Sequence, residues 1–417
     1  MASDFKAAIL FDNFGPYHVA RLRSASRVAN VVGVQFASGS LNYQWQSADQ
    51  VDLEVLTLNP SGTSWEMSRA EFQARLFQAL DQVHPEVVFI PGWATPGPLL
   101  ALQWCLKKQI PAVMMSESNA WDAPRVFFRE LIKRFIVSLS SAALVGGSPQ
   151  RDYMVQLGMP TERVFTGYNI VDNEYFISES DRWRREAGNS SHPYFLASNR
   201  FIAKKNLFLL LDAYASYVKA AQSDSTAQLW PLVLLGDGEL KEPLLKHARG
   251  LGLGLEFSAP WESQGVDLHR GLVFFPGFRQ VEELPRFYAG AGVFVHASLS
   301  EQWGLVVNEA MASELPVIVS RQCGCAIDLV RDGVNGYTFV ASDQSRLSQL
   351  LLEISKMDYP SRKKMGQSGR SIISDYGATH FANGFRSAVE AALHAPPKKS
   401  NLLAHALLAM FCRRLMA

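Results

Sequence analysis

The sequence predicts an α/β protein built from two domains, each with a parallel sheet. Short apolar runs rich in β-branched residues alternate with helical patterns along most of the chain, as in parallel sheets that carry helices on both faces. The length of 417 residues exceeds one typical core and predicts two domains of ordinary size. The alternation is clearest where an apolar run at residues 292–297, a helical pattern at 305–313 and an apolar run at 315–320 form a βαβ unit.

Composition and charge narrow the class of protein. Apolar residues make up 48% of the chain and charged residues 19%, which is typical of a folded globular protein. The net charge of +1 argues against a general nucleic-acid binder. The four cysteines are too few and scattered for a disulfide framework, and Cys323 and Cys325 have no second Cys/His pair nearby to complete a metal site. With neither a signal-peptide pattern nor a run of transmembrane length, we expect a cytoplasmic protein.

The N-terminal half carries the elements of the first predicted sheet. Apolar runs predict strands at residues 7–11, 31–36, 51–56, 87–90, 112–115 and 142–145. Helical patterns fall at residues 69–83 and 98–108, and another helix runs through Val19, Leu22 and Val28.

Several of these strands are followed by residues that could contact a ligand. Gly15 and His18 follow the first strand, Trp93 follows the strand at 87–90, and Glu117 follows the strand at 112–115. Open α/β sheets bind ligands at the carboxyl ends of their strands. Glu117 lies at such a strand end, where a loop carboxylate can also cap the next helix. His18 is more typical of a polar residue at a helix N-terminus than of an acid or base.

The C-terminal half repeats the pattern after a polar, turn-rich segment at residues 180–192, the predicted domain boundary. Further strands are predicted at residues 193–197, 230–235 and 273–277, with a helix at 207–218. The loop after the strand at 193–197 carries basic residues five positions apart, Arg200 and Lys205. Asp237 and its neighbours do not form an Asp-x-Asp metal motif, and we interpret them as a turn.

An anion site is predicted where the loop after residue 297 enters the next helix. Gly304 lets a ligand approach the backbone, and the first-turn amides of Gly304, Leu305 and Val306 attract negative charge. Two carboxylates, Glu301 and Glu309, flank this point eight positions apart. Glu309 lies in an otherwise apolar helix and needs a polar partner, for which the vicinal diol of a ribose is suited. In the alternative interpretation Glu309 faces solvent and Glu301 is a charge at a loop tip.

Residues 298–312, which include Glu301, Gly304 and Glu309, resemble the signature of the family-4 retaining glycosyltransferases (glycosyl transferases group 1). The similarity continues through residues 315–318 and 328–336. Two positions depart from the family pattern: Cys325 stands where a second glycine is common, and Asp328 where Glu is common. Neither removes a main donor contact. The resemblance implies the GT-B fold, two Rossmann-like domains with a donor/acceptor cleft between them.

The resemblance also implies roles for individual residues. Glu301 would contact the donor sugar, the amides of Gly304, Leu305 and Val306 would hold the diphosphate, and Glu309 would bind the ribose. Arg200 and Lys205 would grip the diphosphate, with Glu117 as the fourth candidate for the catalytic set. The remaining candidates are Gly15, Phe278 near the nucleobase and Trp303 on the donor side, and His18 and Trp93 on the acceptor side.

The domains and reaction implied by the resemblance follow from these roles. Residues 1–180 would form the acceptor-side domain and 193–375 the nucleotide-sugar domain, with a helix at 376–394 crossing back and a tail at 395–417. The reaction would move a sugar from a nucleotide-diphosphate donor to a glycan or lipid-linked acceptor in polysaccharide biosynthesis, with retention and without a metal or cofactor. The alternatives are a nucleotide-sugar epimerase, a phosphorylase-like transferase, and a non-catalytic nucleotide-sugar-binding module.

A basic amphipathic stretch at residues 125–136 leaves two interpretations open. On a helix, Arg125, Arg129 and Lys133 would stack at four-residue spacing beside an apolar face. Such a helix could dock on anionic lipid, giving a peripheral protein at the inner face of a membrane. The alternative is an ordinary helix whose apolar face lies in the core.

Overall fold

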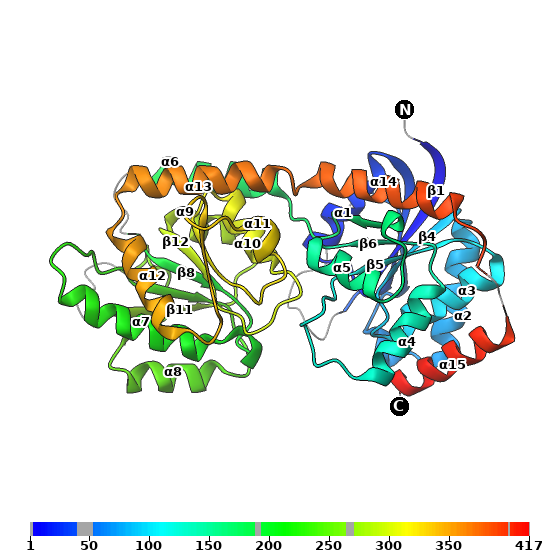
Figure 1. Cartoon of the computed structure of the whole chain (residues 1–417), viewed down its shortest axis with the longest axis horizontal. Helices are drawn as coiled ribbons and strands as arrows, with labels where there is room; N and C mark the ends of the chain where they lie inside the picture. The colour runs from blue at the N-terminus through cyan, green and yellow to red at the C-terminus, as the bar shows by residue number, and fades with distance from the viewer. Residues whose placement is uncertain (1–2, 40–52, 188–192, 264–270, 399–400, 417) are drawn as a thin grey trace. The chain divides into compact units, whose positions relative to one another are not determined.

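Two sheets of seven parallel strands each organise the chain (Figure 1). The computed structural model describes residues 3–39, 53–187, 193–263, 271–398 and 401–416. It divides into a first unit, Met1–Val171 with Tyr376–Ala417, and a second unit, Asp172–Asp375. The predicted α/β class and the two parallel sheets are confirmed.

The first sheet has the strand order β3-β2-β1-β4-β5-β6-β7. Its strands are β1 (Ser3–Phe11), β2 (Ala29–Ala37), β3 (Val55–Asn59), β4 (Val87–Pro91), β5 (Ala112–Ser116), β6 (Ala142–Val145) and β7 (Val164–Thr166). Its helices are α1 (Pro16–Ser26), α2 (Arg69–Val83), α3 (Pro96–Lys108), α4 (Phe127–Ser138), α5 (Ser148–Gln156), α14 (Ala378–His394) and α15 (Leu402–Met416).

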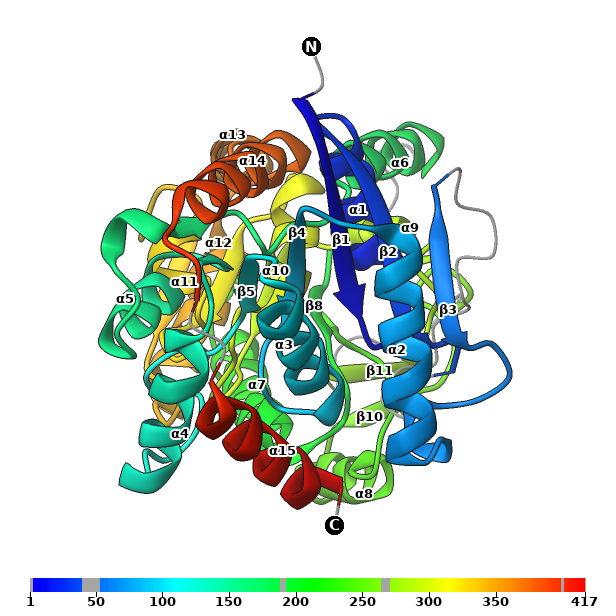
Figure 2. The same ribbon diagram turned by 90° about the vertical axis from the view of Figure 1, so that its right-hand side faces the viewer.

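The first sheet is buried on both faces, and its central strands contain continuous apolar runs, such as residues 7–11 of β1 and 87–90 of β4. In β1, Ala8 and Leu10 join the core under α2, α3 and α15, whereas Ala7 and Ile9 join the core under α1 and α14. Figure 2 shows α2, α3 and α15 on the near side of β1 and β4.

The second sheet has the order β10-β11-β9-β8-β12-β13-β14. Its strands are β8 (Phe195–Ser198), β9 (Leu232–Leu235), β10 (Gly254–Glu256), β11 (Leu272–Gly277), β12 (Val293–His296), β13 (Val317–Ser320) and β14 (Gly336–Phe339). Its helices are α6 (Asn173–Ala187), α7 (Leu207–Gln222), α8 (Lys241–Gly250), α9 (Leu284–Gly290), α10 (Leu305–Ala312), α11 (Ala326–Leu329), α12 (Gln344–Lys356) and α13 (Tyr359–Ser374). In Figure 1, α7, α8 and α12 cover one face of this sheet, and α9, α10 and α13 cover the other.

The structure differs from the prediction mainly at the ends of elements and in short ones. The strand predicted at residues 51–56 is β3, which begins at Val55, and residues 51–52 lie outside the described residues. The strands β7 and β10 were not predicted, because each has only three residues and an apolar run of about four residues is needed to indicate a strand. The predicted boundary at 180–192 is helical as far as Ala187 because α6 continues through it, and residues 188–192 are not described. The C-terminal tail contains a helix, α15, that packs on α3.

None of the described helices combines the length and the apolar character needed to cross a membrane.

Candidate functional site

The strand order of the second sheet reverses between β8 and β12, the first strand of this unit and the strand beside it. The chain leaves β8 toward β9 on one side and leaves β12 toward β13 on the other. A crevice outside the carboxyl ends of the strands at such a switch point is where open α/β sheets bind ligands. The loop after β8 carries Arg200 and Lys205, and the loop after β12 carries Glu301 and Gly304.

These two loops meet through charged side chains. Lys205 Nζ donates a hydrogen bond to Glu301 Oε2, and Lys204 Nζ lies 3.2 Å from Glu301 Oε1. The side chains of Lys205 and Glu301 are each only 12% exposed, whereas that of Lys204 is 42% exposed. Two predicted site residues, 96 positions apart in sequence, therefore contact each other.

Lysine charge controls the ionisation of Glu301. Burial alone would raise the pKa of Glu301, but the neighbouring Lys205 and Lys204 ammonium groups lower that pKa to about 2. His296, the last residue of β12, has its Nε2 3.9 Å from Glu301 Oε2. Burial and the nearby Lys205 charge lower the pKa of His296 to about 3. At neutral pH the site therefore contains one carboxylate, two ammonium groups and a neutral imidazole.

Backbone contacts hold the Glu301 loop in place. Glu301 N–H donates to Gln322 O at 3.2 Å, and Gly324 N–H donates to Glu301 O at 3.0 Å. Leu299 N–H donates to Lys204 O at 2.8 Å, which links this loop to the one after β8. The carboxylate of Glu301 therefore projects from a fixed backbone.

Gly304 is the N-cap of α10. Its backbone has the left-handed conformation that favours glycine, with φ 108° and ψ 63°. An added Cβ would lie 3.4 Å from His296 Nε2. No side chain caps this helix, and the first amides of a helix have no partner within it. Gly304, Leu305 and Val306 are half-buried, and they follow β12 at the same edge of the sheet as the loop that carries Lys205.

Trp303 does not point outward from this loop. Its side chain is buried, and its Nε1 donates to Asn308 Oδ1 at 2.9 Å. The Trp303 side chain therefore links the Glu301 loop to Asn308 in α10.

Glu309 is fully buried, and its Oε2 accepts a hydrogen bond from the hydroxyl of Tyr288 at 2.6 Å. The interpretation in which Glu309 faces solvent is wrong. The polar partner that an acid in an apolar helix requires comes, at least for this oxygen, from α9.

The other donor-side candidates lie at the same edge of the second sheet. Arg200 is exposed, two residues after β8, and Phe278 is half-buried directly after β11.

Sequence reasoning missed three residues of this site. Lys204 and His296 adjoin Glu301 as described above. Asn206 has a left-handed backbone with φ 58°, and its Nδ2 donates to Ala297 O at 3.2 Å and to Ala341 O at 2.8 Å. Asn206 thereby ties the lysine loop to the chain after β12 and after β14. An Asn directly before a helical run was the available signal, since Asn tolerates this conformation.

The first sheet has its own switch point, between β1 and β4. Gly15 is the N-cap of α1, and His18 Nδ1 accepts a hydrogen bond from Gly15 N–H at 3.4 Å. Burial and the nearby Arg21 charge lower the pKa of His18 to about 3. Trp93, after β4, is half-buried against the core.

Glu117, after β5, lies beside the buried Arg21 of α1, with Oε1 3.5 Å from the guanidinium Nη2. Arg21 Nη2 also donates to Asn169 Oδ1 at 3.3 Å, and its guanidinium stacks 4.0 Å from the Tyr168 ring centre. The Glu117 carboxylate is thus positioned by Arg21, a residue of the same unit, and its side chain is partly exposed.

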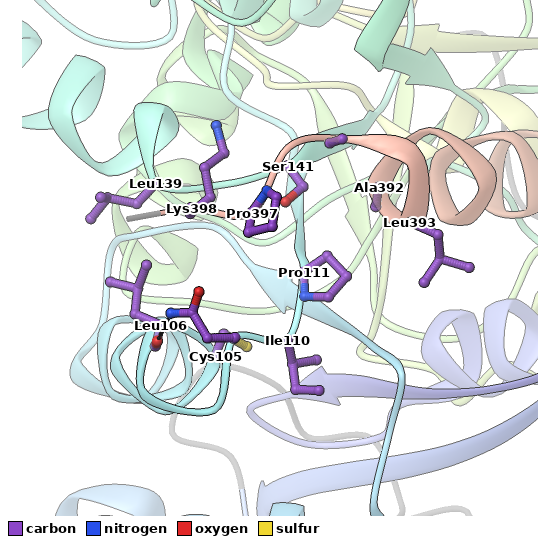
Figure 3. Close-up of a pocket in the computed structure, with 12 residues that line it drawn as sticks. Cys105, Leu106, Ile110, Pro111, Leu139, Ser141, Ala392, Leu393, Pro397 and Lys398 are labelled. Atoms are coloured by element: carbon purple, nitrogen blue, oxygen red, sulfur yellow. Dashed lines mark hydrogen bonds between the residues drawn. The ribbon is translucent and has the colours of Figure 1, made fainter. Parts of the chain in front are cut away.

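A pocket of about 140 Å³ lies at the opposite edge of the first sheet, where β5 and β6 begin (Figure 3). Its lining is largely apolar and includes Cys105, Pro111, Leu139 and Pro397. It contains none of the candidate site residues. Among the residues that the structure describes, no three His, Cys, Asp or Glu side chains are placed to hold a metal ion.

Comparison with known proteins agrees with this geometry. Residues 267–372 match the family model described as glycosyl transferases group 1. Sulfoquinovosyl transferase SQD2 of Arabidopsis thaliana is 25% identical over 323 residues, 72% of this chain and 56% of that protein. Lipopolysaccharide core biosynthesis glycosyltransferase LpsE of Rhizobium meliloti (strain 1021) is 27% identical over 181 residues, 43% of this chain and 44% of that protein. The chain spans about half the length of these curated relatives.

Solved structures share the fold over most of the chain. The Anabaena protein Alr3699/HepE in complex with UDP has a TM-score of 0.67 at 18% identity, covering 93% of this chain and 100% of that one. The apo form of the lipopolysaccharide outer core galactosyltransferase WaaB has a TM-score of 0.63 at 15% identity, covering 92% and 99%. The resemblance to glycosyl transferases group 1 is therefore confirmed, and the chain has the fold of the GT-B glycosyltransferases.

Proposed function

We propose that this protein transfers a sugar from a nucleotide-diphosphate donor to a hydroxyl group of a glycan or lipid-linked acceptor, with retention of anomeric configuration. The observation that carries the proposal is the meeting of Lys205, Glu301 and the start of α10 at the switch point of the second sheet. Relatives named as glycosyltransferases and structural neighbours that hold UDP or UDP-glucose support it.

The donor site of this proposal divides into a diphosphate part and a sugar part. Lys205, Arg200 and the amides of Gly304, Leu305 and Val306 supply positive potential for the diphosphate. Glu301, fixed by its backbone contacts, accepts hydrogen bonds from sugar hydroxyls. Glu309 would meet the ribose, with Tyr288 orienting its carboxylate. Phe278, at the end of β11, is the proposed contact for the base.

In the proposed reaction, the bond between the anomeric carbon and the diphosphate oxygen breaks, and its electron pair leaves with the diphosphate. The acceptor oxygen bonds to the anomeric carbon on the face that the diphosphate leaves, and the acceptor proton passes to the departing phosphate oxygen. Negative charge grows on the diphosphate, so stabilisation is needed most at the oxygens near Lys205 and the α10 amides. These groups serve the role that a divalent ion would otherwise have.

The acceptor is assigned to the first unit. Glu117, held by Arg21, is the proposed partner of the acceptor hydroxyl, with His18 and Trp93 at the neighbouring strand ends. Because the lowered pKa of His18 leaves its ring neutral at neutral pH, we assign His18 a positioning role rather than that of a cationic acid.

The test is a screen of nucleotide sugars by thermal stabilisation, followed by an assay of nucleoside diphosphate release. UDP and UDP-glucose are the first probes, because structural neighbours hold them. A ligand at about a hundred times its Kd stabilises the folded protein by roughly 2.7 kcal/mol. We expect release of nucleoside diphosphate that depends on an acceptor. Conversion of the donor without acceptor would indicate an epimerase, and binding without any turnover a non-catalytic module.

We further propose that α4 docks the protein on an anionic lipid surface, where a lipid-linked acceptor lies. Phe127 and Phe128 at its start are 70% and 73% exposed, and Leu131 and the basic Arg129 and Arg134 are also exposed. Ile136 and Val137 of α4 lie in the core, as the alternative interpretation expects, whereas Phe127, Phe128 and Leu131 remain exposed. Lipid insertion would bury these residues beside two cations.

The cations available for lipid differ from those predicted. Arg125 precedes α4 rather than lying on it, and its Nη1 donates to the Tyr153 hydroxyl at 2.8 Å. Lys133 Nζ lies 2.9 Å from Glu130 Oε1. Arg129 and Arg134 are therefore the candidates for phosphate contact.

Vesicle sedimentation tests this membrane proposal. The protein should sediment with phosphatidylglycerol vesicles at low salt, and the double variant Phe127→Ala, Phe128→Ala should lose most of that binding. Phe257→Ala, which removes an exposed ring from the second unit, is the matched control and should bind like wild type. Unchanged sedimentation of the double variant would contradict the role of α4.

A further inference from the structure

The ion pair between Lys205 and Glu301 joins two residues to which the proposed function gives different parts of the donor. Lys205 is assigned to the diphosphate and Glu301 to the sugar, yet Lys205 Nζ donates to Glu301 Oε2. Both side chains are largely shielded from solvent. Ion pairs of this kind are screened less by water and salt than pairs on the surface.

We propose that this ion pair makes the site discriminate between the intact nucleotide sugar and the spent nucleoside diphosphate, an inference that rests on the proposed function. Glu301 is then a specificity-determining residue that favours release of the product as well as recognition of the sugar.

The physical reason lies in what each ligand offers Glu301. A diphosphate that approaches Lys205 either displaces the Glu301 carboxylate or shares the ammonium with it, since an ammonium has three N–H donors. In the first case the carboxylate loses a hydrogen bond in a shielded position, and in the second the two anions repel each other. Hydroxyls of the transferred sugar compensate by donating to the carboxylate, whereas a nucleoside diphosphate carries no glycosyl group on its terminal phosphate to do so.

The surroundings of Glu301 prevent it from avoiding this conflict. Its backbone is fixed by the hydrogen bonds with Gln322 and Gly324, so the loop cannot carry the carboxylate away without breaking them. His296 is 3.9 Å from the carboxylate and is neutral at neutral pH, so it adds no compensating charge. Lys204 remains as a partner at 3.2 Å, but its side chain is more exposed than that of Lys205.

Glu301→Gln tests the inference because it keeps the shape of the side chain and removes its charge. Isothermal titration calorimetry would measure the binding of UDP, of pyrophosphate, which has no nucleobase, and of UDP-glucose. We expect the variant to bind UDP and pyrophosphate more tightly by about fivefold or more, the low end of typical coupling between sites. UDP-glucose should gain less than UDP, so the preference for the intact donor should fall.

Asp224→Asn is the matched control, since it neutralises a carboxylate paired with Lys356 at 2.7 Å in a loop after α7. It should bind all three ligands like wild type. Equal or weaker binding of UDP and pyrophosphate to Glu301→Gln would overturn the inference while leaving the proposed function intact. Wild-type protein that binds none of the three ligands and releases no nucleoside diphosphate would overturn both.

Discussion

At the scale of single residues, His296 shows how the site tolerates several charges in a shielded place. Its ring is fully buried and faces Glu301, Lys205 and Lys204 from the end of β12. A third cation beside two ammonium groups would be unfavourable, so burial and those charges lower the pKa of His296 to about 3. The histidine thus supports Gly304 and Glu301 without adding charge.

This lowered pKa predicts a dependence of stability on pH. Between pH 6.5, the ordinary pKa of histidine, and about pH 3, the unfolded chain binds a proton at His296 that the folded protein does not. The free energy of unfolding should therefore fall as the pH is lowered below 6.5, by roughly 2 kcal/mol from this residue between pH 6.5 and 5. The pKa of Glu301 is lowered from 4.5 to about 2, so the stability that Glu301 contributes is lost only as the pH falls from about 4.5 to about 2, below the range of pH 6.5 to 5.

Thermal unfolding of His296→Gln between pH 7 and 5 measures the effect. The variant should lose less stability on acidification than wild type. His394→Gln, at the exposed end of α14, is the control and should keep the wild-type dependence. A wild-type pH dependence in His296→Gln would contradict a neutral, buried imidazole. His18 in the first unit, with a similarly lowered pKa, is present in all three proteins.

Glu309 shows what could be predicted from sequence at this scale. A carboxylate within the apolar run of α10 had to meet a polar group, and one partner is the Tyr288 hydroxyl. The identity of that partner could not be predicted, because Tyr288 lies 21 positions earlier on a different helix and only packing brings the two together. Lys204 was missed for a similar reason. The sequence does not show which of the two adjacent lysines contacts Glu301, and only the folded loop brings both ammonium groups to its carboxylate.

At the scale of elements, the start of α10 is the feature on which the proposed diphosphate site depends. The positive φ of Gly304 turns the chain from the Glu301 loop into the helix, and the His296 ring lies where a Cβ would point. A side chain at this position would have to adopt a left-handed backbone and would contact the His296 ring.

Gly304→Ala should lower both stability and UDP binding. Alanine in a left-handed conformation costs roughly 1–2 kcal/mol, and contact with His296 should shift the first amides of α10. Gly333→Ala is the matched control, since Gly333 also has a positive φ of 76° but an added Cβ would meet nothing within 4 Å. Thermal shift with and without UDP should show reduced stability in both variants but reduced UDP binding only in Gly304→Ala. Unimpaired UDP binding by Gly304→Ala would contradict the role of these amides.

Helices and strands with a strong apolar pattern could be predicted from the sequence, whereas helices and strands with a weak apolar pattern could not. The βαβ unit formed by β12, α10 and β13 lies within one residue of most of its predicted ends, because its strands are buried on both faces and read as continuous apolar runs. The helical course of α6 was missed because that helix is rich in polar and charged residues. The start of α4 was placed too early, and this error assigned Arg125 to a helix face.

At the scale of the whole molecule, the two sheets have the same plan. Each reverses its strand order beside its first strand, and each carries candidate residues at the carboxyl ends there. The length and alternation of the sequence were enough to predict two parallel sheets, because these features depend on composition over long stretches. They predicted that the loops after β8 and β12 lie at the same edge of one parallel sheet, but not that these loops contact each other, since that follows from the order of strands in the sheet.

The central claim is that this fold transfers sugar by stabilising a departing diphosphate with its own cations and amides. The most direct measurement is acceptor-dependent release of nucleoside diphosphate by wild type and Lys205→Ala, each with and without a chelator. Lys205→Ala should lower the turnover rate by roughly a hundredfold or more, the loss typical when one preorganised donor is removed. Wild-type activity should persist in the chelator. Full activity of Lys205→Ala, or activity that chelator abolishes and magnesium restores, would contradict the account.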